Sequence, residues 1–257
     1  MDSLKDKIVC VTGASSGIGA ACAIEFARHG AALLLAARRA SQLDTFAAQL
    51  RSDHKIRTRT LALDVRNQQA VDRVFSSLPP DWADIDILVN NAGLSRGLSP
   101  LHEGSVQDWE EMIDTNVKGL LYVSRAVLPG MVKRNRGHVL NIGSIAGHQT
   151  YPGGNVYCAS KFAVVGLTRG LRMDLLGTAV RVSIIDPGLV QTDFSNVRFR
   201  GDTDRAAKVY TNYTPLRASD IAEVVVFCAT RPSHVTLAEV MVLPTDQASV
   251  GMVHKSL

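Results

Sequence analysis

The chain has 257 residues, of which 46% are hydrophobic and 20% are charged, a balance typical of a folded protein with one large α/β domain or two small ones. Its formal net charge is +4 with no long basic run, which gives no electrostatic argument for nucleic-acid binding. No apolar run approaches the ~20 residues of a membrane span and the first residues show no signal-peptide pattern, so we expect a cytoplasmic protein outside the membrane.

Short aliphatic runs alternate with longer segments of helical periodicity. The predicted strands are 7–12, 32–37, 59–64, 85–90, 137–142, 180–185 and 239–243. The predicted helices are 17–29, 40–51, 67–78, 106–134, 155–176 and 219–230. Nearly continuous apolar strands separated by helices indicate a doubly wound α/β fold, a parallel seven-stranded sheet with helices on both faces. No linker, repeat or low-complexity tract divides the chain, and we predict one domain over 1–257.

The first predicted strand runs into a glycine-rich turn, T-G-A-S-S-G-I-G at 12–19, and then into a helix. Glycines there allow a tight turn and bring backbone N–H groups against a pyrophosphate at the helix N-terminus. The spacing is G-x-x-x-G-x-G, and a tight turn without a ligand is the alternative. The position of the turn favours a dinucleotide site. The predicted contacts are Gly13, Ser15, Ser16, Gly17, Ile18 and Gly19.

The end of the second predicted strand indicates which dinucleotide is bound. The sequence L-A-A-R-R-A places Arg38 and Arg39 there, about 20 residues after the glycine turn, with no acidic residue beside them. A carboxylate at this position holds the ribose of NAD, whereas a guanidinium binds the extra phosphate of NADP through charge-assisted hydrogen bonds. The arginines therefore favour NADP(H) over NAD.

Two further strand ends are expected beside the cofactor. A-L-D-V ends the third strand, with Asp64 and Val65 near the adenine, and N-N-A-G at 90–93 ends the fourth. The contacts predicted from the second stretch are Asn91, Ala92 and Gly93. Asn and Gly after a strand are also ordinary turn residues, which is the alternative.

The stretch V-Y-C-A-S-K places Tyr157 and Lys161 four positions apart on a predicted helix. Residues at this spacing are neighbours on one helix face, and a nearby cation lowers the pKa of a tyrosine. Such a pair suits a general base working near neutral pH. An exposed tyrosine and a solvated lysine at chance spacing are the alternative.

The cysteines and histidines form no metal or disulfide pattern. Cys10, Cys22, Cys158 and Cys228 are scattered, with no C-x-x-C pair, and no histidine belongs to an H-E-x-x-H set. We expect no disulfide framework and no metal site.

The glycine turn, N-N-A-G, N-I-G-S-I-A-G at 141–147, Y-C-A-S-K and D-P-G-L-V-Q-T at 186–192 follow in an order that resembles the short-chain dehydrogenase/reductase superfamily over nearly the whole chain. The resemblance implies a Rossmann domain in which Ser144 hydrogen-bonds the reacting oxygen and Tyr157 is the general acid or base. It also implies that Lys161 binds the nicotinamide ribose and lowers the pKa of Tyr157, while Asn116 holds a water on a proton path. Residues implied to line the nicotinamide are Pro187, Gly188, Val190 and Thr192.

Longer phrases, such as Y-P-G-G-N-V-Y-C-A-S-K and D-P-G-L-V-Q-T-D-F-S-N-V-R-F-R-G-D, resemble NADP-dependent 3-hydroxy acid dehydrogenases. That resemblance implies a substrate such as L-serine, L-allo-threonine or 3-hydroxypropionate. A substrate carboxylate needs a cationic partner. Arg198 and Arg200, in a substrate loop at about 190–215, are the candidates, and Arg96 is a third. A solvated or intersubunit arginine is the alternative.

The helix that carries Tyr157 also bears on assembly. Val164, Leu167 and Leu171 form one apolar stripe that could face the sheet, while Phe162 and Val165 point elsewhere. Apolar surface outside the core stripe is typical of a helix covered by another subunit. The superfamily resemblance implies a homotetramer built on this helix and on 106–134. A monomer whose loops bury the helix is the alternative.

Other functions stay open from the sequence. A carbonyl or 3-oxoacyl reductase of larger substrates would use the same catalytic residues, with a basic patch for a carrier protein. A nucleotide-binding sensor without turnover, or a structural protein without a ligand, would not need Ser144, Tyr157, Lys161 and Asn116 together.

Overall fold

Seven parallel strands form the centre of the computed structural model, which describes residues 3–256; Met1, Asp2 and Leu257 of the predicted domain lie outside the described residues. The strand order is β3-β2-β1-β4-β5-β6-β9. The strands are β1 Ile8–Thr12, β2 Ala32–Ala37, β3 Thr58–Ala62, β4 Ile87–Asn90, β5 Gly137–Ile142, β6 Val180–Pro187 and β9 Glu239–Val242. The predicted fold and all seven predicted strands are confirmed.

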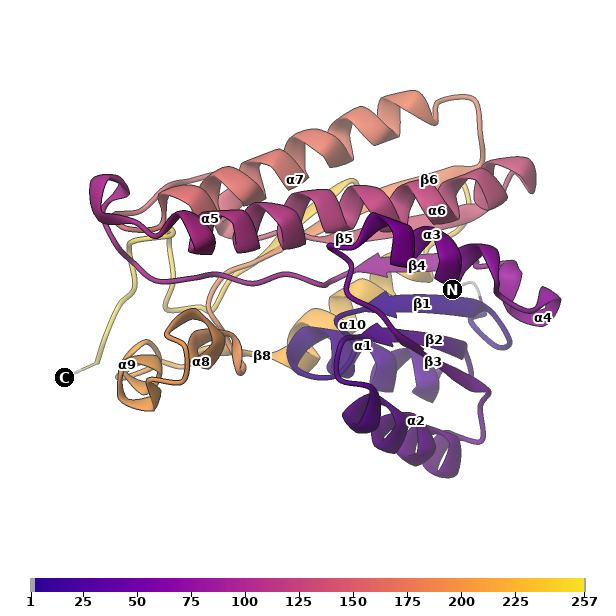
Figure 1. The fold of residues 1–257 in the computed structure, drawn as a ribbon, viewed down its shortest axis with the longest axis horizontal. Helices are drawn as coiled ribbons and strands as arrows, with labels where there is room; N and C mark the ends of the chain where they lie inside the picture. Colours follow the sequence, from indigo (N-terminus) through magenta and orange to yellow (C-terminus); the bar gives the residue numbers. More distant parts are fainter. Residues whose placement is uncertain (1–2, 257) are drawn as a thin grey trace.

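Helices cover both faces of the sheet (Figure 1), each through an apolar core layer. One face carries α1 Gly17–Arg28, α2 Ala40–His54 and α10 Ala218–Ala229; the other carries α3 Gln68–Ser76, α5 Val106–Ile113, α6 Leu120–Lys133 and α7 Asn155–Asp174. The short α4 Pro80–Ala83, η1 Leu101–Glu103 and η3 Ile145–Gly147 complete this part of the chain. Because β1, β2 and β5 are buried on both faces, their continuous apolar sequences predicted this arrangement.

The predicted helix 106–134 is not one regular helix. Between α5 and α6 the chain forms a π-helical segment, η2 Asp114–Gly119. Such segments are common at functional sites. Here Gly119 packs against Val65, where a Cβ would lie 2.6 Å from a valine methyl group. Periodicity could not reveal the extra residue in the turn, since the contacts around it come from distant parts of the chain.

The predicted substrate loop contains regular structure. Strand β7 Val190–Gln191 pairs in parallel with β8 Leu216–Arg217, and α8 Phe194–Arg198 and α9 Thr203–Lys208 lie between them. We call residues 190–217 the flap. In Figure 1 it lies beside the carboxyl ends of the strands, below the N-terminal end of α7.

One surface prediction on α7 was wrong and one residue is exposed as expected. Val165 is buried, in a cluster with Leu120, Val164 and Ile184 of its own subunit. Phe162 is 44% exposed. Residues three apart on a helix differ by about 60° around its axis; Val165 lies against Gly147 of η3, whereas Phe162 lies at the surface. The four cysteines are buried with free thiols, and within 3–256 no helix is both long and apolar enough to cross a membrane.

Candidate active site

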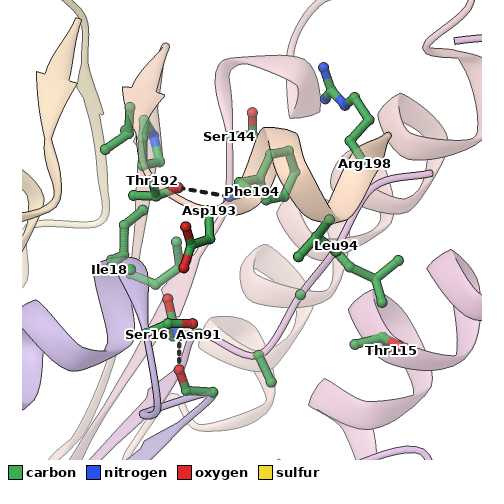
Figure 2. A pocket seen from close by; sticks show the side chains of 18 of the residues that line it. Ser16, Ile18, Asn91, Leu94, Thr115, Ser144, Thr192, Asp193, Phe194 and Arg198 are labelled. Atoms are coloured by element: carbon green, nitrogen blue, oxygen red, sulfur yellow. Dashed lines mark hydrogen bonds between the residues drawn. The ribbon is translucent and has the colours of Figure 1, made fainter. Parts of the chain in front are cut away.

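A cavity of about 520 Å³ opens at the carboxyl ends of the central strands, under the flap. Figure 2 shows Ser16, Ile18 and Asn91 on one side of it, and Ser144, Phe194 and Arg198 on another. Nearly all of the predicted site residues line this cavity. They are Gly13, Ser15, Ser16, Gly17, Ile18, Arg38, Arg39, Asp64, Val65, Asn91, Ala92, Gly93, Ser144, Tyr157, Lys161, Pro187, Gly188, Val190, Thr192 and Arg198. Gly19, Asn116 and Arg200 lie outside the lining.

The glycine turn forms one end of the cavity. Gly13 and Gly17 have φ of +65° and +55°, a left-handed conformation that favours glycine. Gly19 lies inside α1, where a Cβ would be 2.4 Å from the carbonyl oxygen of Gly13. Asn91 Nδ2 donates to the carbonyl oxygen of Thr12 at 2.9 Å and so ties the turn to the fourth strand. The turn is suited to close approach of an anionic group to the backbone and the helix N-terminus.

Two cations lie beside the turn. Arg39 Nη2 donates to the hydroxyl oxygens of Ser15 at 3.0 Å and Ser16 at 3.2 Å. Arg38 is exposed at the mouth of the cavity. The hydroxyls and guanidinium groups form a cluster of donors to which no carboxylate of the described chain is hydrogen-bonded, although the charge of Asp64 acts on Arg38. Such a cluster suits a phosphate.

Asp64, at the end of the third strand, is paired with Arg66 at 2.6 Å. Burial opposes ionisation of this carboxyl, but the hydrogen bonds and charge of Arg66 outweigh burial and hold the pKa of Asp64 below its usual range. The ion pair fixes the wall of the cavity next to Val65.

Tyr157 lies at the other end of the cavity, buried against Phe194. Burial raises the pKa of Tyr157 well above its usual value, and nearby Tyr151 adds to the rise. The charge of Arg198 and a hydrogen bond with Ser144 act in the opposite direction. The phenol is therefore protonated at neutral pH in the protein alone, and it is set to donate a proton.

Lys161 and Tyr157 lie close together, as the spacing predicted, but the ammonium group of Lys161 is hydrogen-bonded to the backbone. Its Nζ is 6.0 Å from the centre of the tyrosine ring and donates instead to the carbonyl oxygen of Ile142 at 2.9 Å. Burial lowers the pKa of Lys161 to about 8, and the charge of Asp186 opposes this change. The carbonyl oxygen of Ile142, which is remote from Lys161 in sequence, thus fixes the ammonium group in the lining of the cavity. The cation that acts on Tyr157 is Arg198.

Asn116 has its side chain committed to the protein. Its Oδ1 accepts from the backbone N–H of Leu94, and its Nδ2 donates to the carbonyl oxygen of Leu94 and to Ser160 Oγ, with distances of 2.8, 2.8 and 2.9 Å. The residue joins the π-helical segment, the segment after β4 and α7. Asn116 thus holds Leu94, which lines the cavity, without lining the cavity itself.

Of the three candidate arginines for a carboxylate, Arg198 alone faces the cavity. Its guanidinium carbon is 5.5 Å from the centre of the Tyr157 ring, and its Nη2 donates to Tyr151 Oη at 3.1 Å. Arg96 pairs with Glu111 at 2.6 Å. Arg200 pairs with Asp108 on α5. These two arginines hold the flap to the rest of the protein, since Arg96 also donates to the carbonyl oxygen of Val197.

Several lining residues were not singled out from the sequence. They include Tyr151, Phe194, Gln247 and Val250. Tyr151 stands at the start of the phrase that contains Tyr157, so that phrase already held a signal. Gln247 and Val250 come from a segment with no motif, and only the folded chain places them here. In the described part of the chain, no group of three or more His, Cys, Asp or Glu residues is arranged to hold a metal ion.

Comparison with known proteins gives consistent matches over nearly the whole chain. Residues 7–202 match the family model described as short chain dehydrogenase. The NADP-dependent 3-hydroxy acid dehydrogenase of Salmonella typhi is 51% identical over 97% of this chain and 100% of its own length. An NADP-dependent 3-hydroxy acid dehydrogenase of Schizosaccharomyces pombe is 43% identical, with 99% of each chain covered. The closed form of a serine dehydrogenase complexed with NADP+ superposes with a TM-score of 0.90 at 47% identity, covering 97% of this chain and 100% of that one.

Proposed function

The chain belongs to the short-chain dehydrogenase family, and we propose that it transfers hydride between NADP(H) and the 3-hydroxyl carbon of a short 3-hydroxy acid. The protein is an oxidoreductase acting on CH–OH groups with NADP(H) as cofactor. The proposed substrates are of the class of L-serine, L-allo-threonine and 3-hydroxypropionate. The observation that carries this class is the guanidinium of Arg198 inside the cavity, next to Tyr157.

The residues present fit the cofactor along the whole cavity. The glycine turn, without Cβ atoms at its left-handed positions, suits the pyrophosphate. Arg38 and Arg39 would hold the 2′-phosphate, Arg39 together with the hydroxyls of Ser15 and Ser16. Lys161 and the D-P-G-L-V-Q-T segment would hold the nicotinamide end. Bound NADP(H) donates or accepts the hydride.

The chain's own residues manage the proton. Tyr157, kept protonated by burial, donates a proton to the substrate oxygen in reduction and takes it back in oxidation. Ser144 hydrogen-bonds the same oxygen and stabilises the charge that develops on it. In the oxidation direction, the charge of Arg198 favours the phenolate of Tyr157. Lys161 supplies a second positive charge at the same end of the cavity.

Arg198 is suited to a carboxylate close to the reacting carbon. Its Nε is buried and has no hydrogen-bond partner among residues 3–256, an arrangement that costs free energy unless a ligand completes it. Its Nη2 contacts Tyr151, whose phenol can donate to the same anion. A 3-hydroxy acid has its carboxylate two bonds from the reacting carbon, which matches a cation stacked near the Tyr157 ring.

The alternative functions find less support in the contacts. A carrier-linked reductase needs free basic groups at the cavity mouth, but Arg96 and Arg200 are neutralised by Glu111 and Asp108. A sensor without turnover has no need for Ser144 beside Tyr157. A carbonyl reductase of larger ketones is the second candidate, since the cavity of about 520 Å³ is also walled by apolar residues such as Phe194 and Val250.

We further propose a cytoplasmic homotetramer whose subunit is one domain with the flap included. Phe162 on α7 and Leu121 and Val132 on α6 are exposed apolar residues. Gly166 has open space around it on the same side of the subunit as these helices. A second copy packing on α6 and α7 would bury these groups.

Nicotinamide absorbance tests the proposal directly. L-serine, L-allo-threonine, 3-hydroxypropionate and a bulky secondary alcohol are each incubated with NADP or NAD. Turnover of the small acids with NADP, abolished in Tyr157→Phe, supports the reaction and the substrate class. Turnover of the bulky alcohol alone would assign the second candidate. Binding of NADPH without turnover in either direction, across acids and ketones, would favour the sensor.

A further inference from the structure

A buried carboxylate lies directly behind the candidate catalytic serine. Asp186, on β6, is 1% exposed and does not line the cavity. Its Oδ1 accepts a hydrogen bond from the backbone N–H of Ser144 at 3.0 Å. Its Oδ2 lies 3.0 Å from Nε2 of His148. The two oxygens thus hold both ends of the turn 144–148, which includes η3.

The rest of the turn is shaped around this carboxylate. At Gly143 an added Cβ would lie 1.9 Å from Asp186 Oδ1, so any other residue would displace the carboxylate. Ser144 uses its Oγ to accept from the backbone N–H of Ala146 at 3.1 Å, and its side chain also lowers the pKa of Tyr157. Ile142, one residue before Gly143, receives the hydrogen bond of Lys161. Ser144 therefore lies in the turn itself, and the acceptor of Lys161 lies two residues before it.

We propose that Asp186 and His148 are positioning residues for the reaction: Asp186 fixes the Ser144 hydroxyl in front of Tyr157 through the Ser144 backbone N–H, and His148 holds the Asp186 carboxylate in place. Neither residue touches the cavity, so each acts through Ser144 and not on the substrate. This assignment rests on the oxidoreductase activity, and on the proposed function only for the choice of substrate in its kinetic test.

His148 stabilises the ionised carboxylate of Asp186, which is buried away from solvent. Burial raises the pKa of Asp186, whereas the hydrogen bond and charge of His148, the Ser144 N–H and the charge of Lys161 lower it. The other charged group that acts on it is Arg169, also on α7. The charge of His148 also lowers the pKa of Glu239 of β9, after the larger effects of Arg169 and Arg172, and Glu239 pairs with Arg169. Loss of His148 therefore raises the pKa of Asp186 further, and a protonated carboxyl is a weaker acceptor for the Ser144 N–H.

A double-mutant cycle separates positioning from general stability. We expect Asp186→Ala to lower kcat by about 10- to 100-fold, less than the roughly 100- to 1,000-fold that complete removal of such a donor costs, with little change in NADPH affinity. In a Ser144→Ala background the same substitution should cost less than about 3-fold, because residues that act through one group are not additive. Asp186→Asn keeps an acceptor oxygen and should recover most of kcat at neutral pH.

The matched control is Ser183→Ala, on the same strand. Ser183 is buried and hydrogen-bonds His138 at 2.9 Å, away from the cavity. Ser183→Ala should lower kcat by the same factor in the Ser144→Ala protein as in the unaltered protein, because the two residues act independently. If Asp186→Ala also lowered kcat by the same factor in both backgrounds, the proposal would be overturned.

His148 gives a pH readout and a second variant in case Asp186→Ala does not fold. In His148→Ala, the fall of kcat on the acid side should begin at higher pH than in the unaltered enzyme. His148→Gln, which can still donate to Asp186, should restore the original profile. Identical profiles for all three proteins would refute the role of His148.

Hydrogen exchange makes the outcome independent of the substrate. In the protein without substrate, Asp186→Ala or His148→Ala should accelerate exchange in a peptide covering 143–148, while Ser183→Ala should not. Unchanged exchange would overturn the proposal even if turnover fell. If none of the hydroxy acids is turned over, the proposed substrate class fails alone, and the cycle is run with a ketone and NADPH.

Discussion

Removal of the Arg198 guanidinium, by Arg198→Leu, tests the substrate class most directly. A hydrogen bond between charged partners contributes about 1.5–3 kcal/mol, and each 1.4 kcal/mol is about tenfold. Because Arg198 is half-buried and keeps one donor on Tyr151, we take a single such hydrogen bond to the substrate. We therefore expect kcat/KM for the hydroxy acid to fall about 10- to 100-fold, mostly through KM.

The assay compares the acid with a neutral alcohol of similar size, and compares Arg198→Leu with Arg200→Leu. Arg200→Leu removes the same charge two residues further along the chain. The partner of Arg200 is Asp108, in the contact between the flap and α5. At a pH above the rising limb of each variant's profile, we expect turnover of the neutral alcohol to change less than about threefold. In Arg200→Leu only a surface ion pair is lost, and in Arg198→Leu the alcohol has no carboxylate to lose a contact. Equal losses for acid and alcohol, or equal losses in the two variants, would refute the carboxylate contact.

The same substitution has a consequence for pH dependence. Arg198 lowers the pKa of Tyr157, against the larger effect of burial. Without that charge the pKa rises further, so the phenolate needed for oxidation forms only at higher pH. The rising limb of kcat/KM for a neutral alcohol should therefore move to higher pH in Arg198→Leu. A limb that moves to lower pH would contradict this electrostatic assignment.

Three further predictions concern the cofactor, the glycine turn and stability. Arg39→Asp should raise KM for NADP by about 10- to 100-fold through loss of a charge-assisted phosphate contact, with a smaller change for NAD; equal changes in steady-state kinetics would count against the 2′-phosphate site. Gly19→Ala should abolish NADPH binding or folding, because its Cβ would lie 2.4 Å from a backbone oxygen, whereas Gly166→Ala has no atom within 4 Å and should leave binding intact; fluorescence titration decides, and binding by Gly19→Ala would contradict the close contact. Burial lowers the pKa of His138 from 6.5 to about 3, so the unfolded chain binds this proton first and the free energy of unfolding falls as pH drops below 6.5. In urea unfolding, His138→Gln should lose about 2 kcal/mol less of this free energy between pH 7 and 5 than the unaltered protein. The same pH dependence of the free energy of unfolding in both proteins would refute this prediction.

Local chemistry and periodicity determined much of this protein. Apolar strands alternating with helices specified the parallel sheet, because each signal lies within a few consecutive residues. The glycine turn before α1 and the arginines after β2 were predictable for the same reason. Tyr157 and Lys161 were identifiable from one helical phrase.

Tertiary structure decided the contacts between segments distant in sequence. Lys161 turns to the carbonyl oxygen of Ile142, and Arg198 takes the place of the cation that acts on Tyr157. Arg198 and Arg200 look alike in the sequence, but α8 places one in the cavity and ion pairs hold the other outside. Asp186 lies next to a proline-glycine pair with no sign of its role behind Ser144. These outcomes depend on hydrogen bonds and ion pairs between side chains that are distant in sequence, and only the packing of the sheet and the flap brings those side chains together.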